Sequence, residues 1–228
     1  MSENLEAIGQ DSLLFDAREA TWATTLSARD ADAARDKEGR HLSPISLALP
    51  RSRMSLDVNH AALVVIDPQI DFSTSFGMQE NTAEVRTIQN LVRLAKAAKL
   101  AGIPLAISRT APRELHSDVI PALKNYVEDK TIICSPHVML KQFWVNDVGL
   151  RLRQLQITQI ILAGMFVSLR IETHLRDFIE QGFEVAVVTD AVAGAKLPEG
   201  IGYLSALVNF RRIVNALWTT DETVQRLG

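Results

Sequence analysis

The sequence has one cysteine, Cys134, among its 228 residues. A single cysteine cannot form an intrachain disulfide, and such chains are typical of the reducing cytosol, so a cytoplasmic location is predicted. Long hydrophobic runs are also missing: AALVVI (61–66) and IILAGMFV (160–167) are far shorter than the roughly 20 residues of a transmembrane helix. Residues 1–20 contain early acids and no basic stretch before an apolar core, so no secretory signal is expected there.

The sequence also lacks an excess of basic residues and the short motifs of metal and nucleotide sites. Its net charge is −3 and its pI is about 6.0, whereas surfaces that bind nucleic acid or anionic membranes need clustered lysine and arginine. The five histidines have no short ligand spacing, there is no CxxC or HExxH, and no glycine-rich phosphate loop follows the first predicted strand. We therefore expect no metal, no cofactor, no nucleic-acid partner and no membrane partner, but a small-molecule substrate.

The first 57 residues differ in composition from the rest of the chain. Residues 16–40 are rich in Ala, Asp and Arg, and residues 43–53 are interrupted by proline. This composition predicts an N-terminal arm over residues 1–57, first helical and then extended, that packs on the domain or on a partner subunit. A disordered tail is the alternative. Trp22 is a candidate anchor for the arm, and residues 58–228 are predicted to form the main domain.

Strand-like and helix-like segments alternate from residue 60 onward. Residues 61–67 are a continuous apolar run that ends in an acid, which is typical of a strand buried on both faces. A helix is predicted from Asn81 or Thr82, because apolar residues recur every three or four positions until Gly102 ends the pattern. Similar patterns predict strands at 103–109, 131–135, 159–165, 183–191 and 213–220, helices at 118–127, 147–156, 168–181 and 200–210, and a last short helix capped by Thr220.

Six strands separated by helices predict a three-layer α-β-α sandwich with a six-stranded, mainly parallel sheet. Ligand sites of such sheets lie beyond the carboxyl ends of the strands. This rule selects Asp67 to Phe72, Arg109, Ser135 to His137, Met165 to Arg170 and Asp190. Asp67 ends the first strand, and a partly desolvated acid at that position suits proton transfer. Capping of the next turn is its alternative role.

The segment VVIDPQIDF (64–72) resembles the DxQxDF signature of the isochorismatase-like cysteine hydrolases. The resemblance continues through GIPLAISR (102–109), FWVNDVGLRLRQLQITQIILAG (143–164), GMFVSLRIETHLRDFIEQGFEVAVVTDA (164–191) and YLSALVNFRRIVNALWTTDE (203–222). It implies the fold of that family, hydrolysis of a small metabolite and assembly into a homodimer or homotetramer. Residues 1–57 lie outside the resemblance.

The chain departs from the catalytic set of aspartate, lysine and cysteine that the resemblance implies. In the family's register Asp67 keeps the aspartate, Arg170 stands at the cysteine position, and His137 stands at the lysine position unless a gap shifts the count. A guanidinium stays protonated and cannot attack a carbonyl, so the thiolate route is closed at that position. Cys134, in mid-strand, is expected to be buried and structural, and His174 is expected to make a structural hydrogen bond.

Two main functions are open on the sequence alone. In the first, Asp67 is the general acid for hydrolysis of a carboxylated metabolite such as a vinyl ether, as in relatives that lack the cysteine. Arg170 or Arg109 would bind the carboxylate and His137 would relay protons. In the second, Arg170 neutralises Asp67 in a non-catalytic, ligand-binding protein. An amide hydrolase with a relocated nucleophile, Ser168 or Cys134, is a weaker third option. The further residues expected to contact the ligand are Gln69, Phe72, Phe166 and Ser168.

Overall fold

A computed structural model describes residues 54–69, 82–109, 118–127, 132–133, 148–194, 196–197 and 200–228. These residues belong to the unit formed by residues 50–228. Three of the residues singled out on sequence, Phe72, Cys134 and His137, lie outside the described residues, as do residues 1–53 of the predicted arm.

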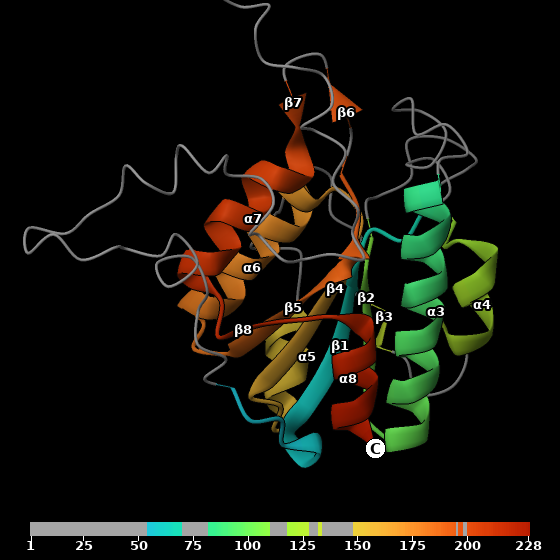
Figure 1. The fold of residues 1–228 in the computed structure, drawn as a ribbon. Helices are drawn as coiled ribbons and strands as arrows, with labels where there is room; N and C mark the ends of the chain where they lie inside the picture. Colours follow the sequence, from blue (N-terminus) through green and yellow to red (C-terminus); the bar gives the residue numbers. More distant parts are fainter. Residues whose placement is uncertain are drawn as a thin grey trace, which may run out of the picture. The chain divides into compact units, whose positions relative to one another are not determined.

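The central sheet has six strands in the order β3–β2–β1–β4–β5–β8, and each neighbouring pair is parallel (Figure 1). The strands are β1 (Ala61–Ile66), β2 (Leu105–Ser108), β3 (Ile132–Ile133), β4 (Gln159–Gly164), β5 (Glu184–Val192) and β8 (Ala216–Trp218). The two central strands, β1 and β4, are buried along their whole length, because helices cover both faces of the sheet. The predicted three-layer fold with a six-stranded parallel sheet is confirmed.

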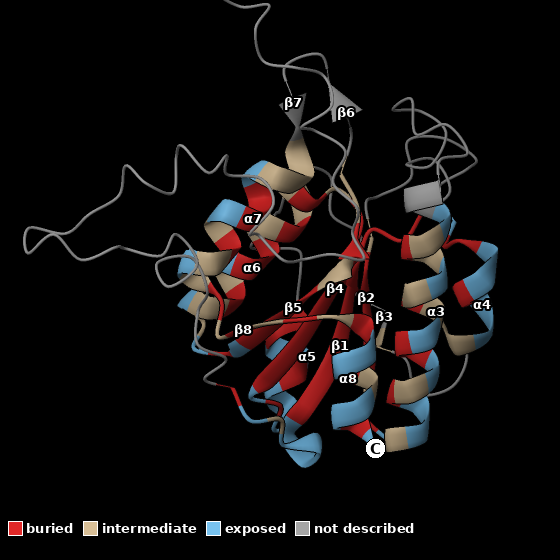
Figure 2. Ribbon diagram, viewed as in Figure 1, coloured by how far each residue is buried: buried red, intermediate tan, exposed pale blue. Residues whose placement is uncertain are grey.

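The helices form the two outer layers (Figure 1). One face of the sheet carries α3 (Thr82–Ala101), α4 (Pro121–Val127) and α8 (Thr220–Leu227), and the other carries α5 (Val148–Gln154), α6 (Glu172–Glu180) and α7 (Gly202–Ile213). Figure 2 shows the buried residues along the strands of the sheet and on the sheet-facing side of the helices. The buried stripe of α3 includes Leu91, Leu94 and Ala95, whereas Val85, expected in that stripe, is 48% exposed.

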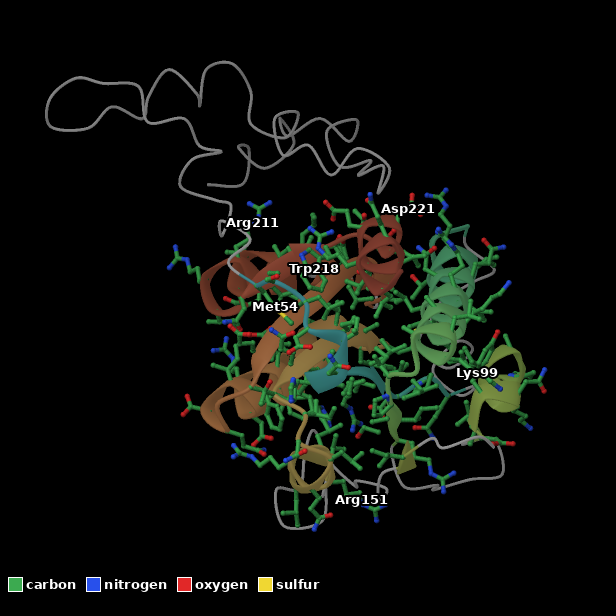
Figure 3. All side chains as sticks on the ribbon, turned by 90° about the horizontal axis from the view of Figure 1, so that it is seen from below. Met54, Lys99, Arg151, Arg211, Trp218 and Asp221 are labelled. Carbon is green, nitrogen blue, oxygen red and sulfur yellow. The ribbon has the colours of Figure 1, made fainter. Side chains whose placement is uncertain are left out.

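The segment before β1 is tied to the domain. Met54 is 4% exposed and belongs to the same apolar core cluster as Trp218. Figure 3 shows both residues toward the middle of the molecule, with Lys99 and Arg151 at its periphery. Gln159 of β4 accepts a hydrogen bond from the Asp57 N–H (2.7 Å) and donates one to the Ser55 carbonyl (2.9 Å). A short 3-10 helix, η3 (Val58–His60), then leads into β1.

Three local details differ from the sequence predictions. The last helix is capped by Thr219, not Thr220, because the Thr219 hydroxyl accepts from the Glu222 N–H while the Glu222 carboxylate accepts from the Thr219 N–H. The helix predicted over 168–181 begins as a π-helix, η4 (Val167–Ile171), before α6. A two-stranded antiparallel hairpin, β6 (Lys196–Leu197) and β7 (Gly200–Ile201), was not predicted. Across the described residues, no helix has the length and apolar character needed to cross a membrane.

Candidate functional site

Asp67 lies directly after β1, at the carboxyl edge of the sheet where the sequence placed it. Its side chain is fully buried, with 0% exposed. Its backbone has φ 47°, a left-handed conformation that Asp and Asn adopt more readily than other residues with a side chain. Its N–H donates to the Ser108 carbonyl (2.7 Å) and its own carbonyl accepts from the Gln69 N–H (2.8 Å). The turn therefore ends β1 and holds the carboxylate inside the protein.

The turn after β4 brings a second segment against Asp67. Gly164 has φ +134°, and a Cβ at this position would lie 2.2 Å from the Ile66 carbonyl oxygen. Met165 donates its N–H to the same oxygen (2.8 Å), and Phe166 is left-handed with φ 58°. Val167 then donates its N–H to the Ala193 carbonyl (2.8 Å). These contacts hold the start of η4 beside the end of β1.

Arg170, on η4, pairs with Asp67. The Arg170 Nε lies 3.7 Å from the Asp67 Oδ2, and the Arg170 side chain is 15% exposed. This separation makes an ion pair but is too long for a hydrogen bond. The Arg170 N–H donates to the Phe166 carbonyl (2.8 Å) and so is not available to an anion. The internal pair, one of the two roles considered for Arg170, is therefore part of the geometry.

His174 connects the two sides of this ion pair. It is 1% exposed, and its Nδ1 lies 2.8 Å from the Arg170 carbonyl oxygen. Because a carbonyl only accepts, Nδ1 carries the proton, and in the neutral ring Nε2 accepts from the Ser108 hydroxyl at 3.3 Å. Ser108 is also the residue whose carbonyl accepts from Asp67. The structural hydrogen bond expected at His174 is confirmed, and the i, i+4 spacing to Arg170 is the sequence signal for it.

A family model described as the isochorismatase domain matches residues 61–200, which is more than half of the chain. This chain belongs to the isochorismatase family. The matched range contains both Asp67 and Arg170 and ends near the β6–β7 hairpin. The resemblance inferred from the sequence motifs is therefore confirmed.

Several solved structures have a similar fold. A cysteine hydrolase from Pseudomonas syringae pv. phaseolicola has a TM-score of 0.69 at 19% identity, covering 77% of this chain and 95% of that one. Nicotinamidase from Bacillus subtilis has a TM-score of 0.59 at 20% identity, covering 70% of this chain and 99% of that one. An octameric hydrolase of unknown specificity from Escherichia coli has a TM-score of 0.61 at 23% identity, covering 76% of this chain and 81% of that one. At these identities the likeness shows the fold alone. No match is found among curated proteins.

Two further residues predicted to bind substrate follow β1 and β2. Gln69 is 1% exposed and forms an antiparallel bridge with Val119. Arg109 follows β2 and is half-buried, and its Nε makes no hydrogen bond within the described part of the chain. The pKa of Asp118 lies below its usual value, chiefly because Lys124 donates a hydrogen bond to it and to a smaller extent because Arg109 is positively charged.

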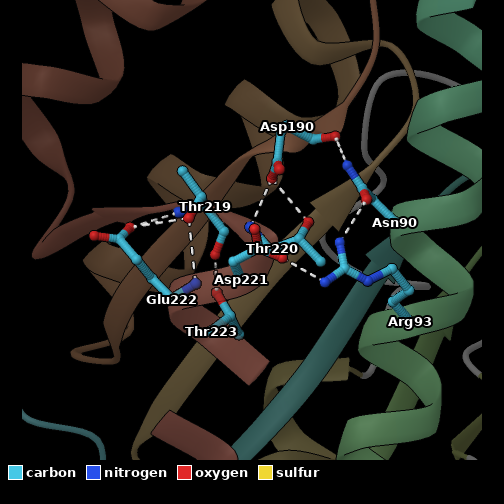
Figure 4. A network of polar contacts seen from close by, with 8 residues as sticks. All are labelled: Asn90, Arg93, Asp190, Thr219, Thr220, Asp221, Glu222 and Thr223. Atoms are coloured by element: carbon cyan, nitrogen blue, oxygen red, sulfur yellow. Dashed lines mark hydrogen bonds and ion pairs between the residues drawn. The ribbon is translucent and has the colours of Figure 1, made fainter. Parts of the chain in front are cut away.

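Asp190 was expected at the same edge but serves a different element. Its Oδ1 accepts from the N–H (2.7 Å) and the hydroxyl (2.8 Å) of Thr220, at the start of α8 (Figure 4). Asn90 of α3 donates to the Asp190 carbonyl (2.8 Å), and Arg93 pairs with Asp221. The carboxylate of Asp190 therefore fastens α8 to the sheet.

The structure thus gathers Asp67, Gln69, Arg109, Phe166, Ser168 and Arg170 on the carboxyl ends of β1, β2 and β4. Phe166 and Ser168 are half-buried. Sequence reasoning did not foresee that His174 and Ser108 connect the segments that carry the two charges, since the contact joins residues 66 positions apart. Within the described ranges, no group of three or more His, Cys, Asp or Glu residues is arranged to hold a metal ion.

Proposed function

We propose that this chain hydrolyses a small carboxylate-bearing metabolite without a covalent intermediate, with Asp67 as proton donor and Arg170 as the anchor of the carboxylate. The observation that carries the proposal is a fully buried aspartate at the end of the central strand, 3.7 Å from the Nε of Arg170, whose side chain is 15% exposed. Position 170 carries no thiol, and we assign water as the attacking group. The described site needs no cofactor for this chemistry.

An enol ether of a 2-oxo acid illustrates the reaction. Protonated Asp67 gives its proton to the terminal alkene carbon, which leaves an oxocarbenium ion. Water adds to that ion and returns a proton to the Asp67 carboxylate, and the hemiketal collapses to a ketone and an alcohol. The net reaction consumes one water. Arg170 holds the substrate carboxylate next to the developing cation, which fixes the orientation of the alkene toward Asp67.

Binding of the same ligand class without turnover is the second candidate. The observation that favours it is the ion pair itself, because an aspartate that is ionised beside Arg170 has no proton to donate. In this case the site recognises a carboxylate and the chain acts as a ligand-binding member of the family.

One assay separates the two candidates. The substrate is 2-methoxyacrylate, with its methyl ester as the uncharged control, and the products, pyruvate from the acid and methyl pyruvate from the ester, are measured by NMR. We expect turnover of the acid by the wild type and a loss of about 100-fold or more in Asp67→Asn. Binding of the acid by calorimetry with no pyruvate above background supports the second candidate. Full turnover by Asp67→Asn overturns the first.

We further propose that the chain assembles as a homodimer or homotetramer and that residues 1–57 pack on the domain or on a partner subunit. One structural neighbour, the hydrolase from Escherichia coli, is an octamer. Light scattering after size-exclusion chromatography measures the number of subunits. The comparison of the full chain with a chain without residues 1–53 shows whether the arm contributes to assembly. A monomer in both cases contradicts the assembly.

A further inference from the structure

We propose that a groove at the amino-terminal edge of the sheet is a second ligand site, which binds a small organic carboxylate with a flat apolar body. The groove has a volume of about 400 Å³, within the range of small-molecule sites. Its lining comes from the end of η3, from the turn between α5 and β4, and from the turn between α6 and β5. These segments precede β1, β4 and β5, whereas Asp67 and Arg170 follow the carboxyl ends of β1 and β4. The inference therefore concerns the opposite edge of the sheet and is independent of the proposed function.

Backbone hydrogen bonds hold the lining segments together. The Thr158 N–H donates to the His60 carbonyl (2.9 Å), and the Thr158 carbonyl accepts from the Glu184 N–H (3.0 Å). Gln156 is left-handed with φ 60°, and its N–H donates to the Arg153 carbonyl (2.9 Å) where the chain turns from α5 into β4. The shape of the groove is thus set by the backbone. Because these N–H groups already have backbone acceptors, side chains are left to recognise a ligand.

The groove combines an apolar floor with a stacked cation. Ile157 and Phe183 line it and are 4% and 5% exposed. The guanidinium carbon of Arg153 lies over the Phe183 ring, 5.2 Å from its centre. Stacking of this kind holds the plane of the guanidinium in one orientation. The N–H groups lie in that plane, where a carboxylate can accept two of them side by side.

Arg153 has no carboxylate partner within the described part of the chain, and its printed contact is the ring of Phe183. The acids next to the groove are already engaged with other side chains. Three of them accept a hydrogen bond, in the pairs Asp57 with His60 (2.8 Å), Glu184 with Gln159 (2.7 Å) and Asp177 with Gln181 (2.5 Å). The guanidinium is therefore the group of the groove that an anion can pair with. An arginine that only covers Phe183 is the competing explanation.

An apolar floor beside a guanidinium matches a ligand that has both parts. A carboxylate joined to a flat ring can place the ring against Ile157 and Phe183 and its charge on Arg153. The amide of Gln156 and the hydroxyl of Thr158 can donate to further polar substituents. A bare anion gains nothing from the floor, and a neutral ring gains nothing from the charge of the guanidinium.

An NMR titration of the isotopically labelled full chain tests the site. Benzoate is the probe, benzamide is the control for charge, and inorganic phosphate is the control for the ring. We expect benzoate to shift the backbone signals of Gln156, Thr158 and Phe183 and the Nε–H signal of Arg153, with a millimolar Kd. Each control is expected to bind at least about tenfold more weakly. A control that binds as tightly as benzoate overturns the inference.

Three variants assign the binding to Arg153. Arg153→Gln is expected to weaken benzoate binding at least about tenfold. Two controls are expected to keep the affinity of the wild type: Arg151→Gln, on the same helix but outside the lining of the groove, and Arg51→Gln combined with Arg53→Gln, in the chain before β1. Unchanged affinity in Arg153→Gln shows that this arginine only covers Phe183 and overturns the inference. A tenfold loss in either control does the same.

The position of the shifts separates this groove from the candidate active site, which is also proposed to bind a carboxylate. Shifts at Gln156, Thr158 and Phe183 support the inference whether or not the segment from Met165 to Arg170 shifts as well. Shifts confined to that second segment overturn the inference while the proposed function stands. No shift in either segment at up to about 10 mM benzoate also overturns it, and leaves the proposed function to its own assay with 2-methoxyacrylate.

Discussion

Gly164 lies directly against the backbone of Ile66. A Cβ on Gly164 would be 2.2 Å from the Ile66 carbonyl oxygen and 2.5 Å from its nitrogen, and the φ of Gly164 is +134°. The Met165 N–H also donates to the Ile66 carbonyl, so the turn that follows Gly164 is held against the end of β1. The position of Arg170 beside Asp67 therefore depends on a residue without a side chain at the end of β4.

Gly164→Ala is expected to lower the free energy of unfolding by more than about 3 kcal/mol, because the methyl group collides with backbone that cannot move aside. Gly182→Ala is the matched control, since Gly182 has φ +83° and open space around its α-carbon. It is expected to cost only about 1 kcal/mol for the left-handed backbone. Urea unfolding measures both, and equal losses would contradict the steric explanation.

Asp67→Ala is expected to be less stable than Asp67→Asn by about 1 kcal/mol, since asparagine tolerates the left-handed backbone at this turn and alanine does not. Both variants remove the charge, so the comparison is free of the electrostatic contribution and combines the backbone conformation with the loss of the buried amide group. Urea unfolding at neutral pH measures the difference. If the two variants are equally stable, the turn has relaxed in both and the left-handed conformation at position 67 is not required.

Arg170→Gln is expected to lower the free energy of unfolding by about 3–5 kcal/mol, because it removes the guanidinium that pairs with the buried Asp67 carboxylate. The double variant Asp67→Asn with Arg170→Gln has no buried charge to compensate. It is therefore expected to recover most of this loss. Chemical denaturation of the two single variants and the double variant gives the coupling free energy. A double variant as unstable as the sum of the single changes would show that the pair does not interact.

His174→Phe is expected to cost about 1–3 kcal/mol, because the ring of the buried residue 174 no longer donates to the Arg170 carbonyl. His174→Asn keeps a side-chain N–H and is expected to lose less. A double-mutant cycle with Ser108→Ala measures the second contact, with an expected coupling of about 0.5–1.5 kcal/mol. Zero coupling would mean that the 3.3 Å contact between Ser108 and His174 contributes nothing to stability.

Tyr203→Phe is expected to change how stability depends on pH. The Tyr203 hydroxyl donates to the Thr189 carbonyl (2.9 Å). Burial, with a smaller contribution from the charge of Asp190, raises the pKa of Tyr203 well above its ordinary value. As pH rises past the unfolded-state pKa of about 10, the unfolded chain releases this proton while the folded chain keeps it. The wild type therefore has the full contribution below about pH 10 and loses it progressively at higher pH.

The measurement compares the free energy of unfolding at about pH 8 and about pH 11 for both proteins. At the lower pH Tyr203→Phe is expected to be less stable by about 1 kcal/mol, through loss of the hydrogen bond. Its decline toward the higher pH is expected to be smaller than that of the wild type. Tyr126→Phe, which changes the other tyrosine of the chain, is the control. An identical decline in Tyr203→Phe and wild type would contradict the assignment.

Local pattern was sufficient to predict most of the fold. The apolar run before Asp67, the spacing of Leu91 and Ala95, and the glycines after α3 and α6, Gly102 and Gly182, depend on residues within a few positions of one another. Such short-range patterns follow from the geometry of a strand or a helix. They also place Asp67 and Arg170 at the correct edge of the sheet, because parallel strands bring their carboxyl ends together.

The pairing of side chains at that edge depended on contacts between distant parts of the chain. Asp67 and Arg170 were candidates for two different roles, and the left-handed turn at Phe166 decides that they meet. Asp190 accepts a hydrogen bond from Thr220, the first residue of α8, because β5 and β8 are neighbours in the sheet. Neither outcome follows from periodicity, since strand order and turn conformation set the distance between residues that are far apart in sequence. The chemistry of the site therefore follows from packing, while the elements that carry it follow from the local sequence.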